Sequence, residues 1–272
     1  MTSGALAPDL IADCAAAALR EELVTFPKPG LVSFVDNGSH PDMSAADFLA
    51  SIAAITPGFS AMAAAAGRGG SLRELQQIGC AAEEEMGAAT GGRNTHRGAI
   101  FCLGLLAAAA GRRHLEGGRT LGEIVRRCWG PEIPQAADLP GTSAGIVLCR
   151  SHRLGGVRRE AAEGFPTVYR HGLPAFASAM PHGRPAARVQ AFFSILRHCE
   201  DTTLLKRGGP SGLEFAREAA RQFLAAGGVA SPHWLRTATE LHRAFVARNL
   251  TAGGAADLLA ATLFIADIRQ RS

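Results

Sequence analysis

The chain has 272 residues, of which 47% are hydrophobic and 19% are charged. This content is sufficient for a buried core and excludes a disordered or fibrous protein. The formal net charge of +4 is carried almost wholly by arginine, since Lys28 and Lys206 are the only lysines. No basic run is interleaved with aromatic residues, so the composition argues against a nucleic-acid partner and favours a small phosphorylated ligand, which arginine binds well.

Cysteine usage and the N-terminal sequence indicate where the protein resides. Six cysteines are spread along the chain without a Cys-x-x-Cys spacing, which predicts reduced thiols in a cytoplasmic protein. No basic segment precedes an apolar run near residue 1, so no signal peptide is expected. The longest apolar run, residues 99–110, is shorter than the roughly 20 residues that a membrane span needs, so no membrane association is expected.

Helix-forming residues dominate the sequence, and no segment shows the alternation of a half-buried strand. We therefore predict an all-α protein, a single compact domain over residues 1–272 with about ten to twelve helices. Capping boxes, in which Ser or Thr is followed three positions later by Asp or Glu, mark helix starts at Ser44, Ser71, Thr120 and Ser211. In chain order, the expected helices are 8–23, 44–66, 72–90, 97–111, 121–128, 141–152, 167–179, 186–199, 212–226, 232–247 and 254–270.

The polar segment 27–43, between the first two helices, is the first candidate site. It gathers a lysine, two aspartates, a histidine and two other hydrogen-bonding side chains: Lys28, Ser33, Asp36, Asn37, His40 and Asp42. These groups suit phosphate binding, metal binding and proton transfer. Asp-Asn-Gly-Ser is also ordinary turn sequence, so a solvated loop is the alternative.

A glycine-rich segment before the apolar run is the second candidate site. Three consecutive glutamates, which include Glu83 and Glu84, precede it, and its polar residues are Arg93, Asn94, Thr95, His96 and Arg97. A helix that begins here presents unpaired backbone N–H groups and the positive end of its dipole, which bind anions. Basic residues are unfavourable at that end of a helix, so a bound anion explains them better than a plain Thr95 cap does.

Three further segments combine glycine or proline with charged residues: 158–166, 200–209 and 249–260. Asp201 and Asp257 stand at expected helix starts, where capping is the default role of a carboxylate. Histidine and cysteine show no zinc-ligand spacing. Ser143 lies in a loose match to a nucleophile elbow, but that motif requires a preceding strand, and none is predicted.

Taken in order, these segments resemble the triphosphoribosyl-dephospho-coenzyme A synthases. The resemblance runs from about residue 10 to 268 and rests on Lys-Pro-Gly-Leu-Val-Ser at 28–33, Asn-Thr-His-Arg-Gly-Ala-Ile-Phe at 94–101 and Gly-Gly-x-Ala-Asp-Leu-Leu-Ala at 253–260, among others. The sequences Phe26-Pro27 and Val-Asp-Asn-Gly-Ser-His at 35–40 are more similar to the malonate decarboxylase branch than to the citrate lyase branch. Arg93 and Thr203 depart from the family pattern.

The resemblance implies a pentosyltransferase that moves the triphosphoribosyl group of ATP to the 2'-hydroxyl of 3'-dephospho-CoA and releases adenine. The product is the prosthetic-group precursor of an acyl carrier protein and passes to a carrier-protein holo-synthase. The α linkage of the family's product implies one inverting displacement, as in inverting glycosidases. ATP is then a substrate, and Mg²⁺ or another divalent cation is the expected cofactor. The sequence allows a homo-oligomer without specifying one.

The same resemblance implies which candidate residues act as base, bind the triphosphate or bind Mg²⁺. For the base we favour Asp36 or Asp42 over His40, because a carboxylate also offsets positive charge on the ribosyl ring. The triphosphate candidates are Lys28, Arg93, Arg97, Arg159 and Arg207, and further substrate contacts are expected from Ser33, Asn37, Asn94, Thr95 and His96. The Mg²⁺ candidates are Glu83, Glu84 and Asp201.

Two other functions fit the same sequence. A helical, Mg²⁺-dependent glycohydrolase of ADP-ribose type would use similar carboxylates with water as the acceptor. A non-catalytic adaptor for a carrier protein would explain the helical composition but leaves the polar segments without a role.

Overall fold

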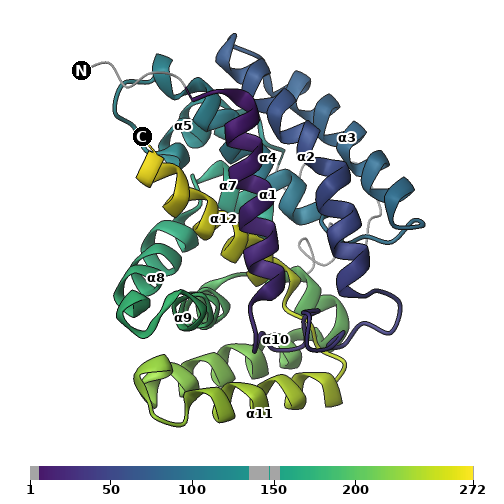
Figure 1. Cartoon of the computed structure of the whole chain (residues 1–272), viewed down its shortest axis with the longest axis vertical. Coiled ribbons are helices and arrows are strands. Elements are labelled where there is room, and N and C mark those ends of the chain that lie inside the picture. Colours follow the sequence, from purple (N-terminus) through teal and green to yellow (C-terminus); the bar gives the residue numbers. More distant parts are fainter. Residues whose placement is uncertain (1–5, 135–146, 148–153, 272) are drawn as a thin grey trace.

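The computed structural model describes residues 6–134, 147 and 154–271 of the chain. In these ranges the protein has eleven α-helices and no strand, which confirms the all-α prediction (Figure 1). The helices are α1 (Pro8–Val24), α2 (Ala45–Gly67), α3 (Leu72–Ala89), α4 (Arg97–Arg112), α5 (Leu121–Cys128), α7 (Gly156–Ala162), α8 (Leu173–Ala179), α9 (Arg184–His198), α10 (Thr202–Ala225), α11 (Trp234–Ala247) and α12 (Gly253–Arg271).

Helices α4 and α12 form the centre of the molecule and are buried over most of their length. Helix α1 packs across α12, α2 packs on α4 and α1, and α3 covers the outer side of α2 (Figure 1). Small side chains allow this close approach: a Cβ on Gly111 of α4 would lie only 2.1 Å from the backbone oxygen of Ala63 on α2. Helices α10 and α11 close one end of the bundle (Figure 1).

Helix α2 is long and apolar enough to cross a membrane by length and composition alone. In the structure it packs against α1, α3 and α4, and Ile52, Ile55 and Phe59 are at most 1% exposed. A core helix of a globular protein passes the same composition test, so its position among three neighbours accounts for its apolar sequence.

Most predicted helix boundaries agree with the structure, but α10 begins ten residues earlier than expected. Asp201 caps it, and the chain continues through a bend at Gly209, where φ is 62°, before Pro210. Pro210 has no N–H to donate, and glycine tolerates the positive φ, so two helical segments join at this point. The capping box expected at Ser211 is therefore wrong: the Ser211 hydroxyl donates to Gly208 O.

Two other segments differ from the prediction. Residues 156–162, expected to be irregular, form α7, and the expected helix 167–179 begins as a π-helical turn over Val168–Gly172 before α8. The expected helix 141–152 and Ser143 lie outside the described residues.

Asp201 joins the starts of two helices, and we expect its loss to destabilise the fold. Its Oδ1 accepts from the backbone N–H groups of Thr203 and Leu204 on α10, and its Oδ2 accepts from that of Ala255 on α12 at 2.9 Å. Asp201→Ala should lower the free energy of unfolding by about 2–4 kcal/mol, because it removes a helix cap and charge-assisted bonds at a buried site. Urea unfolding measures this change.

Thr120→Ala is the matched control, because Thr120 caps only α5 and lies at the surface. It should cost about 1 kcal/mol. Equal costs for the two variants would show that the bond between Asp201 and α12 contributes nothing to stability.

Candidate functional site

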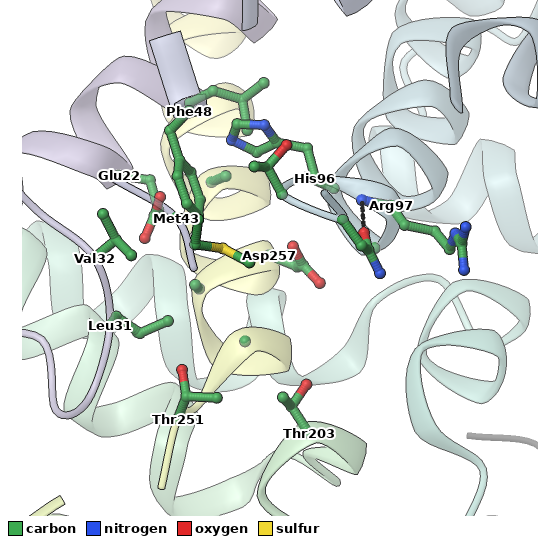
Figure 2. Close-up of a pocket in the computed structure, with 18 of the residues that line it drawn as sticks. Glu22, Leu31, Val32, Met43, Phe48, His96, Arg97, Thr203, Thr251 and Asp257 are labelled. Atoms are coloured by element: carbon green, nitrogen blue, oxygen red, sulfur yellow. Dashed lines mark hydrogen bonds between the residues drawn. The ribbon is translucent and has the colours of Figure 1, made fainter. Parts of the chain in front are cut away.

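Polar segments from distant parts of the chain meet at one pocket, next to the N-terminal ends of α4 and α12 (Figure 2). Its walls come from the end of α1, residues 31–43, the start of α2, residues 94–99, the start of α10 and residues 251–260. Its volume is about 170 Å³. Sites that enclose a small molecule usually measure about 300–1,000 Å³, so this pocket takes one part of a nucleotide-sized ligand and leaves the rest outside.

The start of α4 supplies hydrogen-bond donors to the pocket. The N–H of Ile100 is the first to donate to a carbonyl of the preceding turn, that of His96, so the amides of Gly98 and Ala99 lack such a partner. In the described part of the chain, Thr95 Oγ1 and His96 Nε2 are also buried without a hydrogen-bond partner. Unpaired donors at the positive end of a helix dipole favour a bound anion.

The protonation state of His96 follows from its surroundings. The side chain is 3% exposed, and burial, together with the charge of Lys28, lowers its pKa to about 3. Its Nδ1 lies 2.7 Å from Ser51 Oγ. The neutral tautomer whose Nδ1 accepts from the Ser51 hydroxyl has its proton on Nε2, and this tautomer presents a donor at the pocket.

Asp257, on α12, points into the same pocket beside the start of α4 (Figure 2). A Cβ on Gly98 would lie 1.9 Å from Asp257 Oδ2, so the carboxylate occupies space that only glycine leaves free. Burial raises the pKa of Asp257 well above its usual range, and the negative charges of Asp201 and Glu22 raise it further. The pocket thus favours a proton or a positive charge at this carboxylate.

His40 and Arg207 form a network that holds the segment 36–42 against residues 249–251. Arg207 donates from Nη1 to Ser39 O and to Asn249 Oδ1, and from Nη2 to His40 Nδ1 at 3.3 Å. Guanidinium can only donate, so His40 carries its proton on Nε2 and donates it to Thr251 Oγ1. Burial and the Arg207 charge lower the pKa of His40 to about 4. Both its nitrogens are therefore engaged by the protein.

Lys28 lies beneath the pocket rather than in its wall. The side chain is 1% exposed and forms a buried ion pair with Glu22, whose side chain does line the pocket. Burial lowers the pKa of Lys28, and the charge of Glu22 opposes that shift. The structure thus places this triphosphate candidate as the counter-ion of a pocket carboxylate.

The remaining candidates of the first segment do not line the pocket. Asp36 accepts from the N–H of Gly38 at 2.8 Å, and its carboxylate lies 3.0 Å from His242 Nε2, while His242 Nδ1 lies 2.9 Å from Lys28 O. Ser33 is buried and its hydroxyl accepts from the N–H of Val35. Asn37 and Asp42 are exposed.

The charged residues around the start of α4 pair with each other at the surface. Arg97 lines the pocket with its inner part, and its guanidinium donates to Glu83 at 2.8 Å. Arg93 pairs with Asp47 on α2. Asn94, another pocket residue, accepts from the N–H of Arg97 through Oδ1. Glu84 is exposed.

Arg159 belongs to a second hollow of about 250 Å³, which α7, residues 163–171 and the end of α9 line. It forms an ion pair with Glu200, whose carboxylate also accepts from the N–H groups of Gly155 and Gly156. His171 and His198 stack beside it with ring centroids 3.6 Å apart. The structure thus separates Arg159 from the pocket at α4.

The three Mg²⁺ candidates do not form a metal site with one another. Glu83 pairs with Arg97, Glu84 points to solvent, and the oxygens of Asp201 accept from backbone N–H groups. Over residues 6–134, 147 and 154–271, no group of three or more His, Cys, Asp or Glu side chains is arranged to hold a metal ion. These residues do not fit a dedicated metal cage, and Mg²⁺ on a triphosphate needs no such cage because phosphate oxygens and waters supply most of its ligands.

Sequence reasoning missed Glu22 as a pocket residue, and it named Asp257, with Asp201, only as the next position to test for the base after Asp36 and Asp42. Glu22 lies in an ordinary helical stretch and carries no local signal. Asp257 carries a stronger signal: it is the only charged residue of α12 between Gly253 and Ala266, and a lone carboxylate in an apolar helix is expensive to bury without a function or a partner.

Comparison with known proteins shows the family of the chain. The sequence model of the family described as ATP:dephospho-CoA triphosphoribosyl transferase matches residues 8–272. A protein of Stutzerimonas stutzeri named probable 2-(5''-triphosphoribosyl)-3'-dephosphocoenzyme-A synthase is 40% identical over 272 residues, which cover 95% of this chain and 91% of the relative. The Klebsiella pneumoniae protein named 2-(5''-triphosphoribosyl)-3'-dephosphocoenzyme-A synthase is 36% identical and covers 91% and 87%, respectively.

The Pectobacterium atrosepticum protein of the same name is 38% identical, over 90% of this chain and 84% of its own length. No solved structure matches the chain. The family match over residues 8–272 and the relatives that are 36–40% identical over most of both chains show that the chain belongs to the ATP:dephospho-CoA triphosphoribosyl transferase family.

Proposed function

We propose that this protein transfers the triphosphoribosyl group of ATP to the 2'-hydroxyl of 3'-dephospho-CoA and releases adenine. The observation that carries the proposal is the pocket itself: in a chain of this family, unpaired donors at the start of α4 lie next to the carboxylate of Asp257. A donor cluster suits the phosphates of ATP, and a carboxylate suits a cationic ribosyl centre or a hydroxyl proton.

In this proposal, the triphosphate lies at the start of α4. The backbone of Gly98 and Ala99, the Thr95 hydroxyl and His96 Nε2 donate to it, and Arg97 adds positive charge at the rim. The ribosyl unit then occupies the pocket, whose volume admits one such part of ATP. Mg²⁺ enters as the cation that neutralises the triphosphate charge, and the described carboxylates provide no separate cage for it.

The finer assignments of function are also proposals. The sequence of residues 26–27 and 35–40 favours the carrier protein of malonate decarboxylase, rather than that of citrate lyase, as the protein that receives the prosthetic group. The product would pass to a holo-synthase that loads this carrier protein. Free thiols at the five cysteines that the structure describes and the packing of α2 against α1, α3 and α4 support a cytoplasmic enzyme.

Incubation with ATP, Mg²⁺ and 3'-dephospho-CoA tests the reaction. We expect one adenine released for each dephospho-CoA consumed, with a product heavier by one triphosphoribosyl group, as chromatography and mass analysis would measure. Stoichiometric pyrophosphate would contradict the proposal, because it places the reaction at phosphorus. Free triphosphoribose formed without an acceptor would identify a glycohydrolase instead, and ATP binding with no adenine released would favour a non-catalytic adaptor.

Coenzyme A serves as the matched acceptor control. Its 3'-phosphate crowds the neighbouring 2'-hydroxyl, so it should be consumed more slowly than 3'-dephospho-CoA. Equal rates with the two acceptors would contradict transfer to the 2'-hydroxyl.

A further inference from the structure

We propose that Asp257 is the catalytic base that takes the proton from the 2'-hydroxyl of the acceptor. This inference rests on the proposed function and deepens it, because it assigns the proton transfer to a residue of α12. Asp257 stands where the sequence of the helix is otherwise apolar: every other residue from Gly253 to Ala266 is uncharged. Its carboxylate lines the pocket, so the charged group is positioned at the cavity rather than in the surrounding core.

The two carboxylates that interact with its charge, Glu22 and Asp201, remain negative but are engaged by other groups. Glu22 is paired with Lys28, and Asp201 accepts from the backbone N–H groups of α10 and α12. Asp257 has no hydrogen bond or ion pair with any residue that the structure describes. An unpaired carboxylate at a cavity is available to a ligand, and the two acidic neighbours increase its tendency to accept a proton.

The other candidates for the base are less suitably placed. Asp36 is engaged by Gly38 and His242 and does not line the pocket. His40 does line it, but Arg207 occupies its acceptor nitrogen. Asp42 is exposed outside the pocket. Among the carboxylates that line the pocket, Asp257 alone is unpaired.

The acceptor oxygen forms a bond to C1'' of the ribosyl unit as its proton moves to Asp257, and the bond from C1'' to N9 of adenine breaks. Adenine leaves with that electron pair and takes a proton from water, and Asp257 later returns its proton to solvent. A carboxylate next to C1'' also offsets the positive charge that develops there in the transition state.

Asp257→Asn tests the assignment, with Asp13→Asn on the exposed side of α1 as the matched control. We expect Asp257→Asn to lower kcat by about 10²- to 10⁴-fold while Kd for ATP-Mg²⁺ changes by less than about threefold, because a base acts after binding. Asp13→Asn should behave as the wild type. Single-turnover adenine release and ATP titration give the two constants, and circular dichroism verifies the fold of each variant.

The pH profile separates a base from a structural residue. A protonated carboxyl cannot accept a proton, so wild-type kcat should fall as pH falls through the pKa of Asp257. Burial places that fall above the usual aspartate range near about 4. The remaining activity of Asp257→Asn should lack this acidic limb. Asp257→Glu should recover part of the rate and restore the limb, because it restores the carboxylate.

Other results would overturn the assignment. Turnover of Asp257→Asn within about threefold of the wild type would exclude it as the base. Weakened ATP-Mg²⁺ binding that excess Mg²⁺ restores would identify a metal ligand instead. Asp257 would be a structural residue if Asp257→Asn did not fold and Asp257→Glu folded but showed no acidic limb in its pH profile of kcat. If wild type itself released no adenine, the proposed function would fail and the assignment with it, whereas an active wild type beside an equally active variant contradicts the assignment alone.

Discussion

Gly98→Ala is expected to lower turnover by about 10²-fold while the protein stays folded, because a displacement of about 1 Å at a catalytic group costs that much. The new Cβ would lie 1.9 Å from Asp257 Oδ2. Asp257 must therefore rotate away from its position, or the start of α4 must move. Alanine is a better helix former than glycine by about 1 kcal/mol, which offsets part of the packing cost and keeps the helix intact.

Gly87→Ala on α3 is the control, because a Cβ at Gly87 meets no atom within 4 Å. It should leave turnover unchanged and raise the free energy of unfolding by up to about 1 kcal/mol. Adenine release and thermal unfolding measure both effects. Full activity of Gly98→Ala would mean that the position of Asp257 beside α4 does not matter to the reaction.

Lys28→Met is expected to destabilise the protein by about 3–5 kcal/mol, because removing one partner of a buried ion pair leaves the other charge uncompensated. Lys28 is 1% exposed, and the Glu22 side chain is 6% exposed. Urea unfolding measures the loss. The chain offers a matched control in its only other lysine: Lys206→Met lies at the surface and should change the free energy of unfolding by less than about 0.5 kcal/mol.

The double variant Glu22→Leu with Lys28→Met should recover most of that stability, because it removes both charges together. This recovery distinguishes an ion pair from a lysine that binds phosphate. If Lys28→Met kept its stability and lost only ATP affinity, Lys28 would contact the triphosphate directly, as the sequence suggested.

The all-α fold class and most helix ends could be predicted from the sequence, because helix caps and apolar periodicity depend on residues that are close together in the chain. The boxes at Ser44 and Thr120 form as expected, and α5 covers the predicted residues 121–128. Asp201 was expected at a helix start and does cap α10, but the helix itself was expected only over 212–226. The structure accommodates Gly-Gly-Pro at 208–210 as a bend, so the helical segment from Thr202 joins the expected one.

Part of the candidate site gathers at one pocket. Asn94, Thr95, His96 and Arg97 line it together, since the glycine-rich entry to an apolar helix is a local pattern with a local consequence, and their binding of substrate stays a prediction. The roles of the carboxylates and of Lys28 stay predictions to be tested by the variants above. That one domain covers the whole chain also stays a prediction.

The sequence by itself determined that the protein is helical, that its polar residues gather in a few segments, and that the order of those segments places it in one enzyme family. Only the tertiary structure decided which acidic and basic groups face the same cavity. His40 and Thr251, which are 211 positions apart, form a hydrogen bond. Lys28 forms a buried ion pair with Glu22, and Asp257 lines the pocket. These choices depend on how helices rotate and pack against distant partners, and local hydrogen bonding and periodicity do not specify that rotation.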